Sequence, residues 1–98
     1  MSEAVTPEGL PSVRVVLPAP LLRLFPGAAA DVRIQAYTVS DMLDVLNQRW
    51  PGMRDRLADT SPAVRHHINI FVDGQRAQLE TPLVDGADVY VLTAISGG

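Results

Sequence analysis

The sequence predicts a single α+β domain in which one main helix packs across one face of a mixed sheet. Three observations lead to this prediction: strand-like alternation near both ends of the chain, one amphipathic helical stretch between them, and Asp-Gly turn signals among the later strands. The chain has 98 residues, which fits one compact domain, and 47% of them are hydrophobic, which is enough for a core. We expect a flexible leader at residues 1–11, the folded domain at residues 12–94 and a flexible tail at residues 95–98.

The first two strands are predicted from period-two alternation on either side of a proline-rich interruption. Apolar side chains alternate over residues 13–17, and Pro18 then ends the strand. Residues 21–25 are apolar except for Arg23 and are expected to pack against the domain before the turn signal Pro26-Gly27. A second alternation over residues 32–36 predicts a strand that is joined to the first as a hairpin.

A helix is predicted directly after the second strand. Thr38 can serve as its N-cap, and Asp41 follows three residues later in a box-like spacing. The dipeptide Pro51-Gly52 ends the helix, and a short helical turn is expected over residues 53–57. The apolar side chains at helical spacing form one stripe: Val39, Met42, Leu43, Leu46 and Trp50.

Three further strands are predicted after the helix. Residues 68–72 alternate as a third strand, and Asp73-Gly74 is the strongest hairpin-turn signal in the chain. Residues 75–79 are expected to form the short return strand. A second turn at Asp85-Gly86 leads to a last strand over residues 88–94. The resulting order is β-β-α-β-β-β. With the first and last strands side by side in parallel at the centre of the sheet, this is the ubiquitin-like β-grasp architecture.

The composition excludes several classes of protein. There is no cysteine, so neither a disulfide framework nor a thiolate metal site is possible, and all eight basic residues are arginine. The net charge of −3 argues against nucleic acid as the main partner. The apolar runs are too short to span a membrane, and residues 1–10 lack a signal pattern, so we expect no membrane partner and a cytoplasmic protein.

Side-chain catalysis is not expected from the candidates that the chain offers. His66 and His67 are adjacent in a strand-like segment and point to opposite faces, so they are not expected to share one metal ion. Asp41 and Asp44 lie on one side of the predicted helix, where a cap role and a solvent-facing role are expected. No metal site is predicted.

The last hairpin and the end of the chain carry a family resemblance. Leu83, the turn Asp85-Gly86 and Val89 stand at the positions of a Leu-x-Asp-Gly-Asp-x-Val-like stretch, and the chain ends in Gly97-Gly98. In these features it resembles the ThiS/MoaD family of sulfur carriers. Two positions depart from the family pattern: Ala87 replaces the usual second acidic residue, and Thr93-Ala94 stands where many members have a Pro-Pro pair. These departures and the longer 53–67 region favour carriers of cysteine biosynthesis or specialised metabolism.

The resemblance implies a chemistry located at Gly98. A ubiquitin-activating-like adenylyltransferase would use ATP to adenylate the Gly98 carboxylate, and a sulfur donor protein would convert the adenylate to a thiocarboxylate. A sulfur-accepting biosynthetic enzyme would then make cysteine, thiamin or a secondary metabolite. The chain would be a protein co-substrate rather than an enzyme, with no permanently bound cofactor.

Two further sets of residues are expected to contact these partners. The tail must enter a narrow active site in extended form, and glycine removes the Cβ that would stand beside the reacting carbonyl. Ile95, Ser96 and Gly97 would therefore contact the partner. Tyr90 and Leu92, with Phe71 on the third strand, would form a docking patch on the sheet face opposite the helix. The alternative is that the leader or residues 21–25 cover this patch.

Other functions remain open from the sequence. The chain could be the small subunit of molybdopterin synthase, which predicts a stable complex with a large catalytic subunit. It could be a passive β-grasp interaction module, which predicts full activity after Gly97 and Gly98 are removed. Covalent attachment to target proteins is a further possibility for a ubiquitin-like fold.

Overall fold

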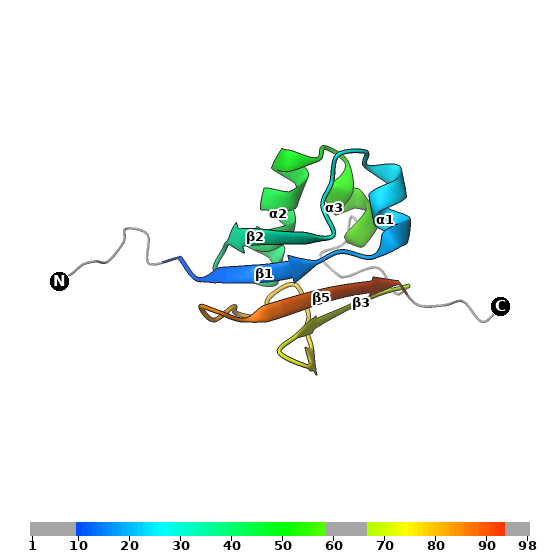
Figure 1. Cartoon of the computed structure of the whole chain (residues 1–98). Coiled ribbons are helices and arrows are strands. Elements are labelled where there is room, and N and C mark those ends of the chain that lie inside the picture. Colours follow the sequence, from blue (N-terminus) through cyan, green and yellow to red (C-terminus); the bar gives the residue numbers. More distant parts are fainter. Residues whose placement is uncertain (1–9, 59–66, 94–98) are drawn as a thin grey trace.

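The computed structural model describes residues 10–58 and 67–93 (Figure 1). Most of the predicted leader, part of the segment before the third strand and residues 94–98 lie outside the described residues. The elements in chain order are β1 (Ser12–Val16), α1 (Ala19–Leu24), β2 (Asp31–Gln35), α2 (Val39–Arg49), α3 (Met53–Leu57), β3 (Ile68–Val72), β4 (Gln75–Arg76) and β5 (Asp88–Thr93).

The five strands form one mixed sheet in the order β2-β1-β5-β3-β4. The first and last strands, β1 and β5, pair in parallel at its centre, with Val15 opposite Val89. The other three pairings are antiparallel. The predicted β-grasp arrangement is therefore confirmed, including the parallel contact between two strands that lie more than 70 residues apart in the chain.

The core lies between the sheet and the three helices, which gather on one side of it (Figure 1). Alternate residues of the central strands point into this layer, so Val13, Val15, Val89 and Val91 are completely buried. The predicted helical stripe meets them from α2, where Val39, Met42, Leu43 and Leu46 are all 0% exposed. Trp50 at the end of α2 is half-buried and packs against the same core.

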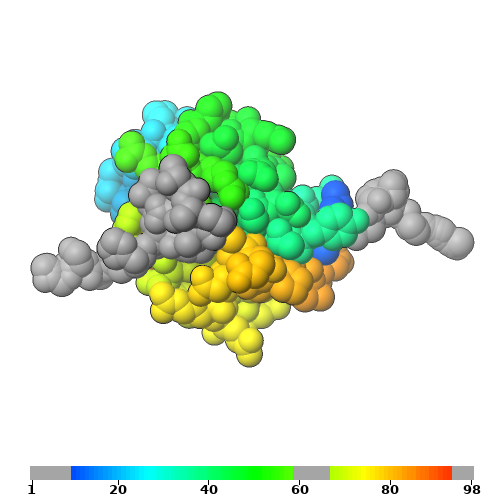
Figure 2. Space-filling model, turned by 180° about the vertical axis from the view of Figure 1, so that it is seen from behind, coloured from blue at the N-terminus to red at the C-terminus, as the bar shows by residue number. Residues whose placement is uncertain are grey.

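The N-terminal end of α2 is held by the segment between β4 and β5. The first two helical amides, of Val39 and Ser40, donate to the carbonyls of Thr81 (3.1 Å) and Leu79 (2.9 Å). Asp41 N–H donates to Thr38 Oγ1 at 3.1 Å, which confirms the predicted cap. Figure 2 shows this face, where α2 (green) and the segment before β5 (yellow to orange) lie side by side. Each amide of the first turn thus has an acceptor within the chain.

We expect Thr38→Ala to lower the free energy of unfolding by about 1 kcal/mol, because the Asp41 amide loses its acceptor at the start of α2. Urea unfolding followed by circular dichroism measures this change. Thr38→Ser, which keeps the hydroxyl oxygen, is the control and should retain most of the stability. Equal losses in the two variants would contradict a role for the hydroxyl.

Relative to the sequence prediction, the structure adds one element and shortens another. The expected packing of residues 21–25 is confirmed, and residues 19–24 achieve it as a short helix, α1, with Phe25 as its C-cap. The helix begins after Pro18 and places Pro20 in its first turn, where a proline needs no amide partner. Leu21 of this helix is buried in the core. The return strand is shorter than predicted and covers only Gln75–Arg76. Ala77 N–H still donates to the Ile70 carbonyl of β3 (2.8 Å), and the chain then leaves the sheet, so that the Leu79 carbonyl accepts the Ser40 amide of α2.

Two Asp-Gly turns connect the ends of the strands. Asp73 and Gly74 both have positive φ angles, 49° and 85°, as a tight primed hairpin turn requires. The carboxylate Oδ1 of Asp73 also accepts the Asp88 amide at 3.0 Å, which ties this turn to the start of β5. At the other turn, Gly86 N–H donates to the Ser12 carbonyl (2.8 Å), joining it to β1.

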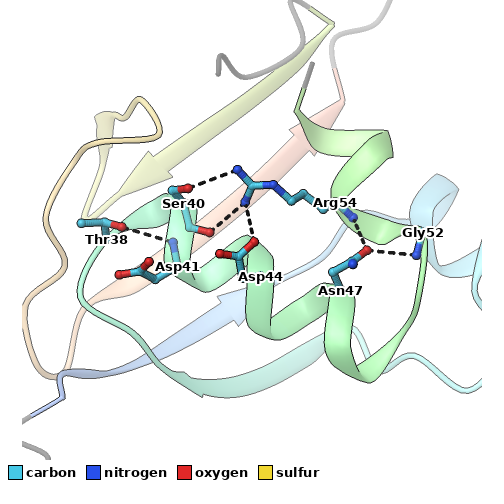
Figure 3. A network of polar contacts seen from close by, with 7 residues as sticks. All are labelled: Thr38, Ser40, Asp41, Asp44, Asn47, Gly52 and Arg54. Carbon is cyan, nitrogen blue, oxygen red and sulfur yellow. Dashed lines mark hydrogen bonds and ion pairs between the residues drawn. The ribbon is translucent and has the colours of Figure 1, made fainter. Parts of the chain in front are cut away.

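The predicted helical turn over 53–57 is confirmed as α3, which is tied to α2 by polar contacts (Figure 3). Asn47 Oδ1 accepts the backbone amides of Gly52 (3.0 Å) and Arg54 (3.2 Å). The Arg54 guanidinium donates to the Ser40 carbonyl at 2.9 Å and lies 3.1 Å from Asp44 Oδ1. The carboxylate of Asp44 is therefore engaged in holding two helices together, next to solvent.

Candidate functional site

The end of β5 is the described part of the chain that lies nearest to Gly98. Thr93, the last described residue, is opposite Ile68 of β3, and β5 also pairs with β1 on its other side. The start of β5 is therefore held along both edges, whereas its last three residues are held by β3 alone, which gives the end of the strand a defined position on the domain. The predicted tail contacts Ile95, Ser96 and Gly97, and the reacting residue Gly98, lie outside the described residues.

The remaining predicted partner contacts lie together on the face of the sheet opposite the helices. Val89 and Val91 of β5 face the core, whereas Tyr90 and Leu92 are 39% and 44% exposed. This confirms the prediction that the two pairs of side chains point to opposite faces of the sheet. Phe71 of β3 is half-buried and lies directly opposite Tyr90. The structure therefore brings the three predicted patch residues onto one surface.

Strand register extends this surface across the sheet. Val16 of β1 is the partner of Tyr90 on the side away from Phe71. We call Val16, Tyr90, Phe71 and Leu92 the sheet stripe. Residues 21–25 do not cover it, because Leu21, Leu22 and Phe25 pack into or against the core on the opposite side of the sheet. The leader, which is the other predicted cover, lies mostly outside the described residues.

Charged groups lie beside the sheet stripe. Arg14 Nε donates to Asp31 Oδ2 at 2.7 Å, its Nη1 lies 3.5 Å from Asp88 Oδ1, and its guanidinium stands 6.0 Å from the centre of the Tyr90 ring. The hydrogen bond to Asp31, with a further contribution from Tyr90, raises the pKa of Arg14. The guanidinium thus stays charged, and it connects three strands at one end of the stripe. Sequence reasoning missed this group, since only the strand register brings its members together.

The described residues offer no cluster of side chains for metal binding. None of their His, Asp and Glu side chains form a group of three that could hold a metal ion. His67 is exposed near the start of β3, and His66 lies outside the described residues. The amides at the start of α2 are occupied by Thr81, Leu79 and Thr38, so they do not form a phosphate site. Within the described part of the chain, no helix is long and apolar enough to cross a membrane.

Comparison with known proteins agrees with this geometry. The ThiS family profile matches residues 15–98, which include the sheet, the helices and the Gly-Gly end. The sulfur carrier protein CysO of Mycobacterium tuberculosis is 30% identical over 93 residues, spanning 89% of this chain and 99% of that protein.

Solved structures give the same relationship. A CysO of Amycolatopsis orientalis, solved in complex with BexX, superposes with a TM-score of 0.77 at 28% identity and covers 88% of this chain and 99% of its own. SAMP1 of Haloferax volcanii superposes with a TM-score of 0.74 at 27% identity and covers 89% and 99%. With its β-grasp sheet and its Gly-Gly end, the chain belongs to the ThiS family of sulfur-carrier proteins, which act as protein co-substrates rather than as enzymes.

Proposed function

We propose that Gly98 of this chain is adenylated and then converted to a thiocarboxylate, which donates sulfur in the biosynthesis of a sulfur-containing small molecule. The observation that carries the proposal is that Gly98 follows only five residues after Thr93, the end of a central strand that pairs with β1 over its first half and with β3 up to its last residue. Such a strand is a rigid base from which a short side-chain-free end can reach into another protein's active site. Family membership supports the same role.

The proposed chemistry has two activation steps and one transfer. A free α-carboxyl group has a pKa of about 3.5 and is a poor electrophile at neutral pH because it is ionised. Its oxygen attacks the α-phosphorus of ATP, pyrophosphate leaves, and an acyl-adenylate forms. A hydrosulfide ion released by the donor protein then attacks the acyl carbon, AMP leaves, and loss of the S–H proton gives the Gly98 thiocarboxylate. The thiocarboxylate sulfur displaces the leaving group of the acceptor enzyme's activated substrate. Water then cleaves the acyl C–S bond, which leaves the sulfur on the product and returns the Gly98 carboxylate.

The proposed partners are a ubiquitin-activating-like adenylyltransferase that uses ATP, a sulfur donor protein and a sulfur-accepting enzyme. The pathway that we favour is that of cysteine or of a specialised metabolite, with thiamin as a further product class. The similarity to CysO proteins supports this choice, and one of these was solved together with a protein partner, BexX. The proposed setting is the cytoplasm, where ATP is available to the activating enzyme.

The sheet stripe is the proposed docking surface for these partners. Tyr90 and Leu92 leave apolar side chains in solvent on strand β5, whose end leads into the tail. A partner that covers the stripe would bury apolar area and hold the domain while Gly98 occupies its active site. Arg76 stands at one end of the row through Val16, Tyr90 and Phe71, and the ion pair of Asp31 with Arg14 stands at the other. The difference between a single positive charge and a neutralised pair would set the orientation of docking.

Intact-protein mass spectrometry tests the proposed chemistry. The untagged chain is incubated with ATP, the host's adenylyltransferase and a sulfur source. We expect a species that is heavier by the exchange of one oxygen for sulfur, mapped to Gly98 by fragmentation. A sample without ATP is the control and should show only the carboxylate. Persistent absence of the thiocarboxylate in the complete mixture would overturn the proposal.

Other functions predict different results. Purification of the native chain with a stoichiometric large catalytic subunit would indicate a molybdopterin synthase. Full biological activity after removal of Gly97 and Gly98 would indicate a passive interaction module. Recovery of the chain in an isopeptide bond to other proteins would indicate covalent modification.

A further inference from the structure

The sheet face opposite the helices carries one row of side chains that crosses all five strands. Strand pairing joins each member to the next in the order β2-β1-β5-β3-β4, and the members are Asp31, Val16, Tyr90, Phe71 and Arg76. Neighbouring strands lie about 4.8 Å apart, so the row is roughly 19 Å long. Because β5 is the central strand, Tyr90 stands at the middle of the row.

The two halves of this row are complementary to each other. Asp31 and Arg76 are exposed at its ends and carry opposite charges, whereas the residues between them are apolar or aromatic. Two copies of the chain that face each other across a two-fold axis through Tyr90, parallel to β5, exchange the ends of the row. Asp31 of each copy then meets Arg76 of the other. Val16 meets Phe71, and the two Tyr90 rings meet at the axis, so one patch pairs with itself in an isologous interface.

The alternative face-to-face arrangement, with the two-fold axis across the strands, is disfavoured by the same surface. It would place Arg76 on Arg76 and Asp31 on Asp31, which are contacts between like charges. It would also place Leu92, two positions after Tyr90 on this face, opposite Asp88, two positions before it. With the axis along the strands, Leu92 meets Leu92 and extends the apolar contact. Charges and apolar side chains therefore favour the same axis.

The acidic end of the row keeps a negative charge although an arginine lies beside it. Arg14 is 2.7 Å from Asp31 Oδ2 and 3.5 Å from Asp88 Oδ1, so these three groups together carry one negative charge. The Asp31 side chain remains 54% exposed, and a carboxylate accepts more than one hydrogen bond. Arg76 is exposed and has no ion-pair partner among the described residues, so its guanidinium is available to this carboxylate. The two Asp88 side chains, which also meet at the axis, are flanked by the Arg14 guanidinium of each copy.

We propose that the free chain forms a weak symmetric dimer through this row, with a second copy of the chain covering the sheet stripe. A face roughly 19 Å wide and five to six residues long is small for a permanent interface, so the dimer dissociates readily. A partner enzyme must displace one copy before it can bind the stripe. This inference goes beyond the proposed function and does not depend on the chemistry at Gly98.

The first test uses the wild-type, full-length chain. In sedimentation equilibrium from about 20 µM to about 1 mM, the average mass should rise from that of a monomer toward that of a dimer. An NMR sample that mixes isotope-labelled with unlabelled chain should show nuclear Overhauser contacts from the Val16 methyl groups of one copy to the Phe71 ring of the other. A chain that stays monomeric at the highest concentration, or that associates without contacts in the stripe, would overturn the proposal.

The second test reverses the charges at the two ends of the row. Arg76→Glu and Asp31→Arg should each weaken self-association by about tenfold or more, because each replaces two contacts between unlike charges with two between like charges. An equimolar mixture of the two variants should dimerise within about threefold of the wild type. In the mixed pair, the new glutamate faces the new arginine, and the unchanged Asp31 of one chain faces the unchanged Arg76 of the other.

Arg23→Glu is the matched control for charge. It makes the same change as Arg76→Glu on the exposed surface of α1, which lies on the other side of the sheet (Figure 1), and it should associate like the wild type. Equal weakening by Arg23→Glu would show a dependence on net charge alone and would overturn the pairing. A mixture that stays monomeric would overturn it as well, and the contacts between wild-type copies decide the question if a variant fails to fold.

These results are separate from those that test the proposed function. A chain that dimerises through the stripe but forms no thiocarboxylate would retain this inference and lose the carrier role. A monomeric chain that forms the thiocarboxylate would lose this inference and retain the carrier role.

Discussion

Replacement of Gly98 by valine is expected to lower the rate of thiocarboxylate formation by about 100-fold or more, because the new branched side chain displaces the reacting carbonyl in the partner's active site. The free energy of unfolding should change by less than about 0.5 kcal/mol, since Gly98 lies five residues beyond the last paired residue, Thr93. Mass spectrometry of the reaction with ATP, the adenylyltransferase and a sulfur source measures the first effect. Urea unfolding measures the second.

Ala94→Val is the control for bulk added just before the tail. It places the same valine side chain four residues before Gly98, away from the reacting carbonyl, so activity should stay within about threefold of the wild type. Normal thiocarboxylate formation by Gly98→Val would contradict the proposed site of the chemistry. A large loss of stability in the same variant would show that the end of the chain has a structural role.

Leu43→Ala is expected to have the largest effect on stability. Leu43 is 0% exposed in the core between α2 and the sheet, so its truncation removes apolar contacts and leaves a cavity, at a cost of about 2–5 kcal/mol. A domain of this size buries a modest fraction of its surface, and such a loss is a large part of its total stability. Thermal and urea unfolding measure it. The fraction that remains folded should keep the wild-type KM for the adenylyltransferase.

Leu92→Ala makes the same chemical change on the opposite face of the sheet and is the matched variant. Leu92 is 44% exposed, so the free energy of unfolding should change by less than about 1 kcal/mol. Because Leu92 belongs to the sheet stripe, the KM for the adenylyltransferase should rise about fivefold to tenfold, equivalent to about 1 kcal/mol of binding. An unchanged KM for Leu92→Ala, or a raised KM for folded Leu43→Ala, would contradict the assignment of the stripe to partner docking.

Local sequence patterns were enough to predict most of the elements. The alternation over β1, β3 and β5 identified which side chains face the core, because a strand presents successive residues to opposite faces. Thr38 and Asp41 marked the start of α2, and the Asp73-Gly74 pair marked a hairpin that needs two positive φ angles. In each case the cause is confined to a few neighbouring residues.

The sequence missed elements whose form depends on distant partners. Residues 19–24 carry Pro20 in their first turn and follow directly after Pro18, and their helical state depends on burying Leu21 in a core made elsewhere in the chain. The return strand after Gly74 was predicted to continue to Leu79. It stops at Arg76, and the Leu79 carbonyl accepts an amide of α2, nearly 40 residues earlier in the chain. Local propensity contains no information about either contact.

The sequence alone identified the proposed reactive end, because Gly97-Gly98 would need only the absence of side chains to serve as an attachment point. It also determined the β-grasp class through the order and periodicity of its elements. Only the tertiary structure decided the surfaces around that end. Strand register placed Val16 and Arg14 beside Tyr90, and it placed Asp31 and Arg76 at opposite ends of one row. Each of these surfaces joins residues from separate parts of the chain, so its composition is determined by the long-range pairing and packing of the elements.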